Sequence, residues 1–106
     1  VIAPFRIYYS FEKLQSKFPA QAGFTAPSKS FKRAVDRNRI KRLTREAYRL
    51  QKNDLYDALK ERSRQMIIFF VYNGKEIPKY EIVTQSMTSI IKKLVKIVNE
   101  DVSPHT

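Results

Sequence analysis

Alternating apolar and polar residues predict two short strands in the first quarter of the chain. The first covers Phe5–Phe11, where every second residue is apolar or aromatic, a period that is typical of a strand with one buried face. The second covers Gln21–Pro27, with Phe24 and Ala26 on the face opposite Thr25. Pro27 has no amide hydrogen for a sheet ladder, so this strand should end there or lie exposed. Residues 12–20 between the strands read as a turn region.

A helical period follows these strands. The apolar residues are spaced three and four apart and would form one stripe of an amphipathic helix: Ile40, Leu43, Ala47 and Leu50. Ser28 or Ser30 is a plausible N-cap, and Asn53 and Asp54 mark an end or a break. Residues 55–62 are compatible with one further short helical turn.

The rest of the chain predicts a buried strand and a long helix. Met66–Tyr72 is uniformly apolar or aromatic, as in a strand buried on both faces, and Asn73–Gly74 is a turn signal. Pro78 should open the last helix, whose core positions would be Tyr80, Val83, Met87, Ile90, Leu94 and Val98. Residues 1–106 are expected to form a single domain of α+β class, a small mixed sheet packed with two main helices, with residues 100–106 as a frayed tail.

The order of elements predicts one parallel crossover. The strands before and after the first predicted helix could be parallel and form a βαβ unit. Such crossovers are right-handed in nearly all proteins.

Positive charge is concentrated in the first predicted helix. Residues 28–50 hold nine Lys or Arg and two acids, which gives seven of the chain's net eleven positive charges. On a helical wheel the side opposite the apolar stripe carries Asn38, Arg42, Arg45 and Arg49, with Arg33, Arg37 and Lys41 beside them. A helix tuned only for solubility would mix both signs on its polar face. A row of guanidinium groups instead favours a polyanion, most simply the phosphates of a nucleic acid.

Composition excludes several kinds of site. No apolar run approaches the ~20 residues that a bilayer span needs, and Val1–Phe11 is interrupted by Pro4 and Arg6, so no membrane partner or signal peptide is expected. Cysteine is absent, which excludes thiolate metal sites and fits the reducing cytoplasm. The single histidine, His105, lies in a polar tail and is expected to be inert. We therefore predict no catalytic residue, no metal ligand and no small-molecule cofactor in the protein itself.

The basic segment resembles the signature helix of the bacterial ribonuclease P protein subunit. That family has an RNR motif followed by a KRxxRE pattern, and residues 37–46 read RNRIKRLTRE here. Ala22–Thr25, Lys29 and Ala34–Val35 are similar to the family's lead-in to this helix, and the resemblance covers essentially the whole chain.

The resemblance implies a fold and a function. The family fold is αβββαβα with a left-handed crossover around the motif helix. The protein would be a basic cofactor of a catalytic RNA, and the ribonucleoprotein would remove the 5′ leader from precursor tRNA. Hydrolysis would be carried out by the RNA subunit with bound magnesium, so the chain would be the non-catalytic subunit of an endoribonuclease. Its partners would be the ribonuclease P RNA and precursor tRNA.

The resemblance also assigns roles to residues. It matches Lys29 and six residues of the motif helix to RNA-binding positions: Arg37, Asn38, Arg39, Lys41, Arg42 and Arg45. The helical wheel adds Arg33 and Arg49 to the expected RNA-binding set, and Arg39 is expected to face the RNA subunit. The cleft for the single-stranded leader would be lined by Tyr8, Thr25, Asn38, Arg42 and Arg45. Tyr8 would then be an exposed stacking platform for bases, the alternative being ordinary half-buried packing. Six other aromatic and methionine side chains are expected in the core and not in contact with a ligand: Tyr9, Phe11, Met66, Phe69, Phe70 and Met87.

The chain also departs from the family pattern. A helix and a strand normally precede the segment at which this chain begins, and they are expected to be absent here, which would leave the leader cleft incomplete. Pro27 and Ser30 replace residues that are more usual in the lead-in.

Two other functions are compatible with the charge. A structural RNA-binding protein of ribosomal type would share it but would not need the ordered motif. A self-sufficient nuclease would need clustered carboxylates for two metal ions. Only Asp54, Asp57 and Glu61 fall on one helical face, where they are interpreted as solvated or paired with Arg62 and Arg64.

Overall fold

A computed structural model describes residues 4–15 and 17–100 of the chain. The described elements are β1 (Phe5–Phe11), β2 (Ala20–Thr25), α1 (Ala34–Gln51), α2 (Asn53–Glu61), β3 (Met66–Tyr72) and α3 (Tyr80–Glu100). The fold is therefore α+β, as predicted. His105 and the tail expected to be frayed lie, from residue 101 on, outside the described residues.

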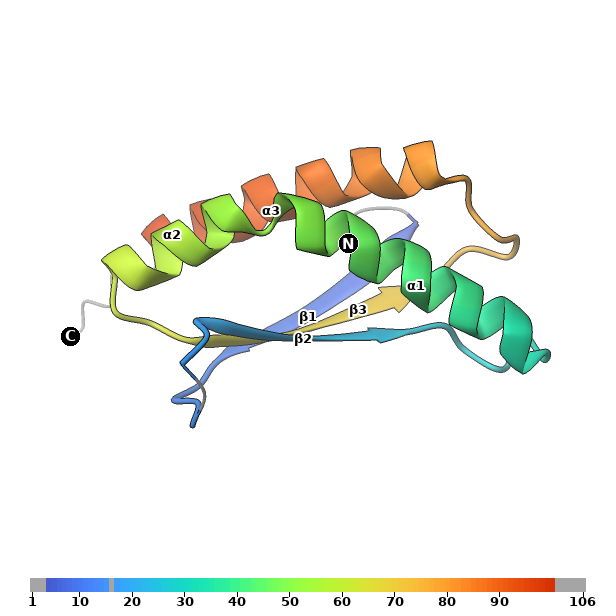
Figure 1. The fold of residues 1–106 in the computed structure, drawn as a ribbon, viewed down its shortest axis with the longest axis horizontal. Coiled ribbons are helices and arrows are strands. Elements are labelled where there is room, and N and C mark those ends of the chain that lie inside the picture. The colour runs from blue at the N-terminus through green and yellow to red at the C-terminus, as the bar shows by residue number, and fades with distance from the viewer. Residues whose placement is uncertain (1–3, 16, 101–106) are drawn as a thin grey trace.

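The three strands form one mixed sheet with β3 at its centre. The strand order is β1-β3-β2, with β1 antiparallel and β2 parallel to β3. The predicted parallel pairing of the strands that flank the basic helix is thus confirmed. In Figure 1, β2 lies nearest the viewer with β3 behind it, both run to the right, and α1 and α2 return above them. This arrangement makes the crossover left-handed, as the family resemblance implies and against the general preference.

All three helices cover the same face of the sheet (Figure 1). Residues of β3 alternate between its two faces, and those toward the helices are buried: Met66, Ile68, Phe70 and Tyr72. They pack against the apolar sides of α2 and α3, including Leu55, Leu59, Met87 and Ile90. The other face of the sheet has no helix over it, and we call it the open face.

Several sequence-based predictions about α1 were wrong in detail. Arg33 is the N-cap residue, whereas Ser28 and Ser30 lie in the preceding segment, where the amide of Ser30 donates to the carbonyl oxygen of Pro27. Leu50 was expected in the apolar stripe but its side chain is 57% exposed. Tyr48 is buried instead, because its ring packs edge-on against Phe24 and Phe70 with centroids 5.7 and 5.4 Å away.

A second correction concerns the β-strand aromatics. Tyr9 and Phe69 were expected in the core, yet they are 44% and 52% exposed. Phe69 points to the open face of the central strand, and Tyr9 lies toward the end of an edge strand. Phe11 is half-buried, whereas Phe70, Met66 and Met87 are core residues as predicted.

Candidate nucleic-acid interface

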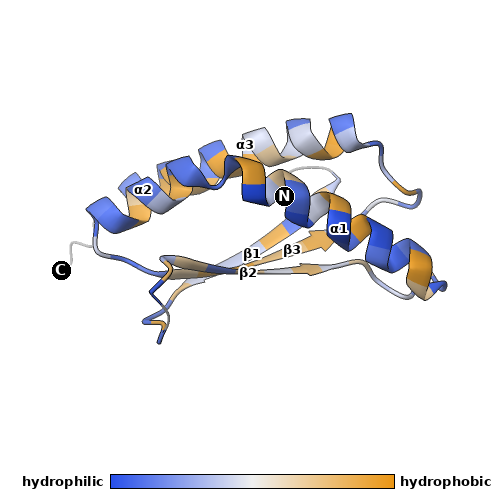
Figure 2. Ribbon diagram, in the orientation of Figure 1, coloured by the Kyte–Doolittle hydropathy of each residue, from blue (hydrophilic) through white to orange (hydrophobic). Residues whose placement is uncertain are grey.

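The outward side of α1 is strongly basic. Helix α1 is mostly hydrophilic along the side that faces the viewer in Figure 2. Asn38, Arg39, Arg42 and Arg45 are all exposed, and within the described residues none of the three arginines forms an ion pair. Arg45 also lies over the ring of Phe24, with its guanidinium carbon 5.6 Å from the ring centroid. The three arginines keep their charge available to a polyanion, and we call these four residues the basic face of α1.

Two arginines beside this face are paired with acids. Arg49 binds Glu46 through both Nε and Nη2, which lowers the pKa of Glu46 and raises that of Arg49. Arg33 lies 3.9 Å from the carboxylate of Asp36. Both pairs are on the surface, where an ion pair stabilises little and a phosphate can compete for the arginine.

Arg37 has a contact that the helical wheel did not predict. Its Nη1 donates to the carbonyl oxygens of Phe31 at 2.7 Å and Lys32 at 2.9 Å. The side chain is half-buried, because it lies on the inner flank of α1. Part of the guanidinium group therefore holds the segment that connects β2 to α1.

A shallow groove of about 720 Å³ runs along the first half of α1. Its lining brings together four of the residues selected from sequence: Arg33, Asn38, Arg39 and Arg42. The apolar Val35 and Leu43 and the acidic Asp36 also line it, whereas Lys41 and Arg45 do not. The groove thus joins positive charge to a small apolar floor.

The open face of the sheet carries an aromatic pair. Tyr8 in β1 lies directly opposite Phe69 in β3, and both side chains are 52% exposed. They line a hollow of about 280 Å³ with Ile67. On the other side of Phe69 the partner in β2 is Gly23, and a Cβ there would lie 2.7 Å from the Phe69 ring. We call Tyr8 and Phe69 the aromatic platform.

The platform is separate from the basic face of α1. Helix α1 packs over β2 on the covered side of the sheet, whereas Tyr8 is on the open face of the opposite edge strand. Thr25 is exposed on the open face where β2 ends, and the exposed Lys29 lies on the connection from there to α1. In Figure 1 the first turn of α1 descends beside this end of β2, so Thr25 and Lys29 lie near the start of α1.

Phe69 is the residue that sequence reasoning missed. The run from Met66 to Tyr72 is uniformly apolar, so it does not reveal which of its residues face solvent. The available signal was Gly23, since a glycine inside a strand marks the close approach of another group.

The described part of the chain shows no grouped metal ligands and no membrane span. No three His, Cys, Asp or Glu side chains among the described residues lie close enough to hold a metal ion. None of the helices described is both long and apolar enough to cross a bilayer.

Comparisons with known proteins agree with one another. The family model "Ribonuclease P" matches residues 2–95. A ribonuclease P protein component of Porphyromonas gingivalis is 37% identical over 97 residues, covering 92% of this chain and 69% of that protein. Another from Chlorobaculum tepidum is 40% identical over 85 residues, covering 74% of this chain and 55% of that protein. No solved structure gave a significant match.

Proposed function

Since the chain belongs to the ribonuclease P protein family, we propose that it holds two RNA ligands during 5′ maturation of tRNA. One is the catalytic RNA subunit and the other is the single-stranded 5′ leader of precursor tRNA. Family membership makes the chain a subunit of an endoribonuclease and implies a ribonuclease P RNA as partner. We further propose that the RNA, with magnesium, performs the hydrolysis in the cytoplasm.

The observation that carries this proposal is that one small domain exposes both the basic face of α1 and, on the open face of its sheet, the aromatic platform. The guanidinium group of an arginine binds phosphate through two parallel hydrogen bonds and can also stack on a base. Exposed aromatic rings on a sheet stack the bases of single strands, and each stacked base contributes roughly 1–3 kcal/mol. A paired RNA helix hides its bases, so the platform favours an unpaired segment such as the leader.

The positions suggest a path for the leader. Its bases would stack on Tyr8 and Phe69, and its backbone would pass Thr25 and Lys29 toward the start of α1. Asn38, Arg42 and Arg45 would complete this site. The other basic residues around α1 would contact the RNA subunit: Arg33, Arg37, Arg39, Lys41 and Arg49.

Reconstitution tests the function directly. The purified chain is added to the cognate RNA subunit, and cleavage of precursor tRNA is followed at low magnesium. We expect a large rise in the rate with protein present and no cleavage by the protein alone. An unchanged rate at low magnesium would reject the role as cofactor, and cleavage without the RNA subunit would show that the protein is itself a nuclease.

A further inference from the structure

The edge strand β2 pairs with another strand on one side only. That side bonds to β3, and no further strand of the described chain adjoins the other side, which we call the free edge. In Figure 1 the free edge faces the viewer. Unpaired amide and carbonyl groups on such an edge can accept an additional strand, and many proteins prevent this with charged residues or proline. Residues 20–25 read AQAGFT and contain neither, so β2 itself carries no such protection.

Two hydrogen bonds show which backbone groups reach the free edge. The carbonyl oxygen of Pro19 accepts from an amide of β3 at 2.9 Å and therefore faces the sheet. The carbonyl oxygen of Ala20 faces the other way, where the hydroxyl of Tyr56 donates to it at 3.4 Å. Since the backbone groups of successive residues in a strand point to opposite sides, the amides and carbonyls of Ala22 and Phe24 lie on the free edge.

A cation lies beside each end of this edge. The guanidinium carbon of Arg45 is 5.6 Å from the ring centroid of Phe24, near the end of β2. The ammonium nitrogen of Lys52 is 5.0 Å from the ring centroid of Tyr56, whose hydroxyl reaches the first residue of β2. Neither cation forms an ion pair within the part of the chain that the structure describes. Both belong to the helical layer, so they lie on the covered side of the sheet.

The spacing of the two cations suits an extended polypeptide. Along the strand, Ala20 and Phe24 are ~13 Å apart. Along the helix, Arg45 and Lys52 are ~10 Å apart. In a strand added to the free edge, every second side chain would face the helices, so acidic residues four positions apart would lie near the two cations. The intervening side chains would face the open side of the sheet.

Charge distinguishes between the possible occupants of the free edge. A second copy of this chain would bring the same cations to the same edge and has the same net charge of +11, so the two copies would repel each other. An RNA strand carries negative charge but has no peptide groups to continue the hydrogen-bond ladder. An acidic polypeptide supplies both the ladder and the carboxylates.

We propose that the free edge of β2 binds an extended acidic segment of a partner protein as an added strand, with carboxylates on alternate residues facing Arg45 and Lys52. In this mode of recognition the main-chain hydrogen bonds provide affinity and the alternate side chains provide specificity. The interaction goes beyond the proposed function, and it does not need RNA. Because Arg45 also belongs to the proposed leader site, a bound segment should compete with the leader.

A synthetic peptide tests the chemistry of the edge. The probe is a six-residue peptide of alternating Thr and Glu with blocked ends, and calorimetry should detect its binding to the unchanged protein. The matched control is the same peptide methylated on every amide nitrogen, which has the same charge but cannot extend the sheet. We expect the control to bind more weakly, by about 2- to 13-fold for each hydrogen bond lost.

Amide hydrogen exchange tests the placement. With the peptide bound, the amides of Ala22 and Phe24 should exchange more slowly. The amide of Gly23 faces β3 and is already paired, so its exchange should change less and serves as the internal reference.

Protein variants test the same edge from the other side. Ala22→Pro removes an amide that β3 does not use and places a ring on the free edge, so it should abolish peptide binding while the sheet stays intact. Lys52→Ala should weaken binding about 1.5- to 5-fold, the range for one surface ion pair. Lys93→Ala, which removes an exposed lysine of α3, is the control for general loss of charge. Thermal unfolding checks that each variant is folded, and the two peptides provide the test if Ala22→Pro is not.

The proposal is overturned if the unchanged protein does not bind the peptide, or if the fully methylated peptide binds equally well. Unchanged exchange of the Ala22 and Phe24 amides in the presence of bound peptide would also overturn it. Two further results would assign the edge to another occupant: protection of these amides by a single-stranded RNA but not by the peptide, or dimerisation of the protein alone that Ala22→Pro abolishes. Failure of the reconstitution described above would reject the proposed function and leave all of these measurements unaffected.

Discussion

At the residue scale, the aromatic platform depends on a glycine. Gly23 pairs with Phe69 across the sheet, and the ring of Phe69 occupies the space that a side chain at position 23 would fill. The sequence could place Tyr8 on the open face, because β1 alternates clearly between polar and apolar residues. It could not place Phe69 there, since every residue of β3 is apolar or aromatic and the register with β2 is set by tertiary structure.

Gly23→Ala should weaken leader binding with little effect on folding. The new Cβ would lie 2.7 Å from two atoms of the Phe69 ring, and that exposed ring can swing away from the sheet. The measurement is the affinity of the holoenzyme for precursor tRNA relative to mature tRNA, which has no leader. Gln21→Ala, at an exposed position on the same face of β2, is the control and should leave this ratio unchanged. An unchanged ratio for Gly23→Ala would remove Phe69 from the leader site.

Tyr48→Phe should stabilise the fold or leave its stability unchanged at neutral pH. The Tyr48 hydroxyl is buried without a hydrogen-bond partner among the described residues, and removing such a group recovers up to roughly 1–3 kcal/mol of desolvation cost. Denaturant unfolding at pH 7 measures the free energy of unfolding. A variant less stable by more than about 1 kcal/mol would mean that the hydroxyl has a stabilising partner.

The same variant should resist alkaline conditions better. Burial raises the pKa of Tyr48 above its ordinary value, so the folded protein keeps the neutral phenol. The unfolded chain ionises at about pH 10, and stability is therefore lost as the pH rises above that value. Between pH 9 and pH 11 the free energy of unfolding should fall less for Tyr48→Phe than for the unchanged protein. Parallel curves for the two proteins would contradict this account.

At the element scale, the sequence predicted that α1 is a helix, but it did not predict which side of the helix is buried against the sheet. The three-and-four spacing of Ile40, Leu43 and Ala47 identified its existence and its approximate buried side. The true buried side is shifted toward Tyr48 and Thr44, because Tyr48 packs on sheet aromatics and the Thr44 hydroxyl donates to the carbonyl oxygen of Ile40 at 2.8 Å. A residue with a polar atom can be buried when that atom forms a hydrogen bond, as in Thr44, or when its ring packs on other rings, as in Tyr48. The spacing of purely apolar residues does not identify such positions.

Replacing Arg42 and Arg45 together by alanine should slow leader removal while the protein stays folded. Both side chains are exposed and outside ion pairs in the described chain, so their loss affects RNA more than folding. Arg45 also contacts Phe24, and an exposed cation–π contact contributes only about 0.5–1 kcal/mol. The measurement is the rate of cleavage of precursor tRNA at low magnesium with substrate below saturation. Lys92→Ala with Lys93→Ala, which removes two exposed positive charges from α3, is the matched control and should have a smaller effect. Equal effects of the two double changes would mean that total charge, and not the basic face of α1, determines the rate.

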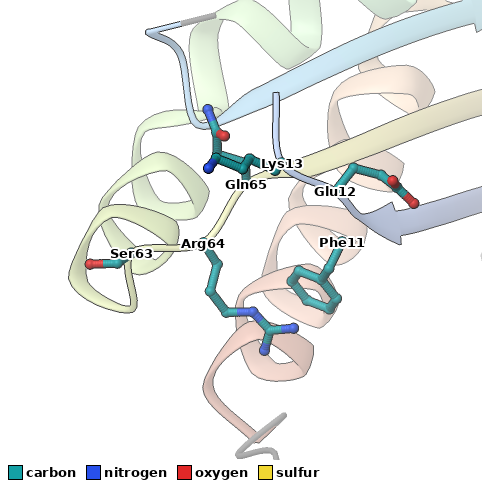
Figure 3. Close-up of a pocket in the computed structure, with 6 residues that line it drawn as sticks. All are labelled: Phe11, Glu12, Lys13, Ser63, Arg64 and Gln65. Carbon is teal, nitrogen blue, oxygen red and sulfur yellow. The ribbon is translucent and has the colours of Figure 1, made fainter. Parts of the chain in front are cut away.

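At the scale of the whole molecule, the covered face of the sheet packs against the helices, and the exposed basic and aromatic surfaces are the ones that we propose to bind RNA. The spacing of apolar residues, the order of the elements and the distribution of charge predicted the α+β class, the parallel pairing of β2 with β3 and the basic helix. The left-handed crossover was implied only by the family resemblance, because no local pattern in the sequence encodes handedness and the general rule favours the opposite hand. A pocket of about 460 Å³ (Figure 3) also escaped sequence reasoning, since it joins residues 11–13 to residues 63–65, which are far apart in the chain.

The net charge of +11 makes salt the sharpest test of how many phosphates the molecule contacts. Each phosphate neutralised by Lys or Arg releases counterions, so log affinity should fall linearly with log salt, by ~0.7–0.9 for each such phosphate. Replacing Arg42 and Arg45 by alanine should make this slope shallower, because the basic face of α1 is proposed to neutralise phosphates of the bound RNA. Lys92→Ala with Lys93→Ala removes the same charge from two exposed positions on α3 and should change the slope less. Salt titrations of the two double variants provide the slopes, and equal slopes would contradict a specific role of the basic face.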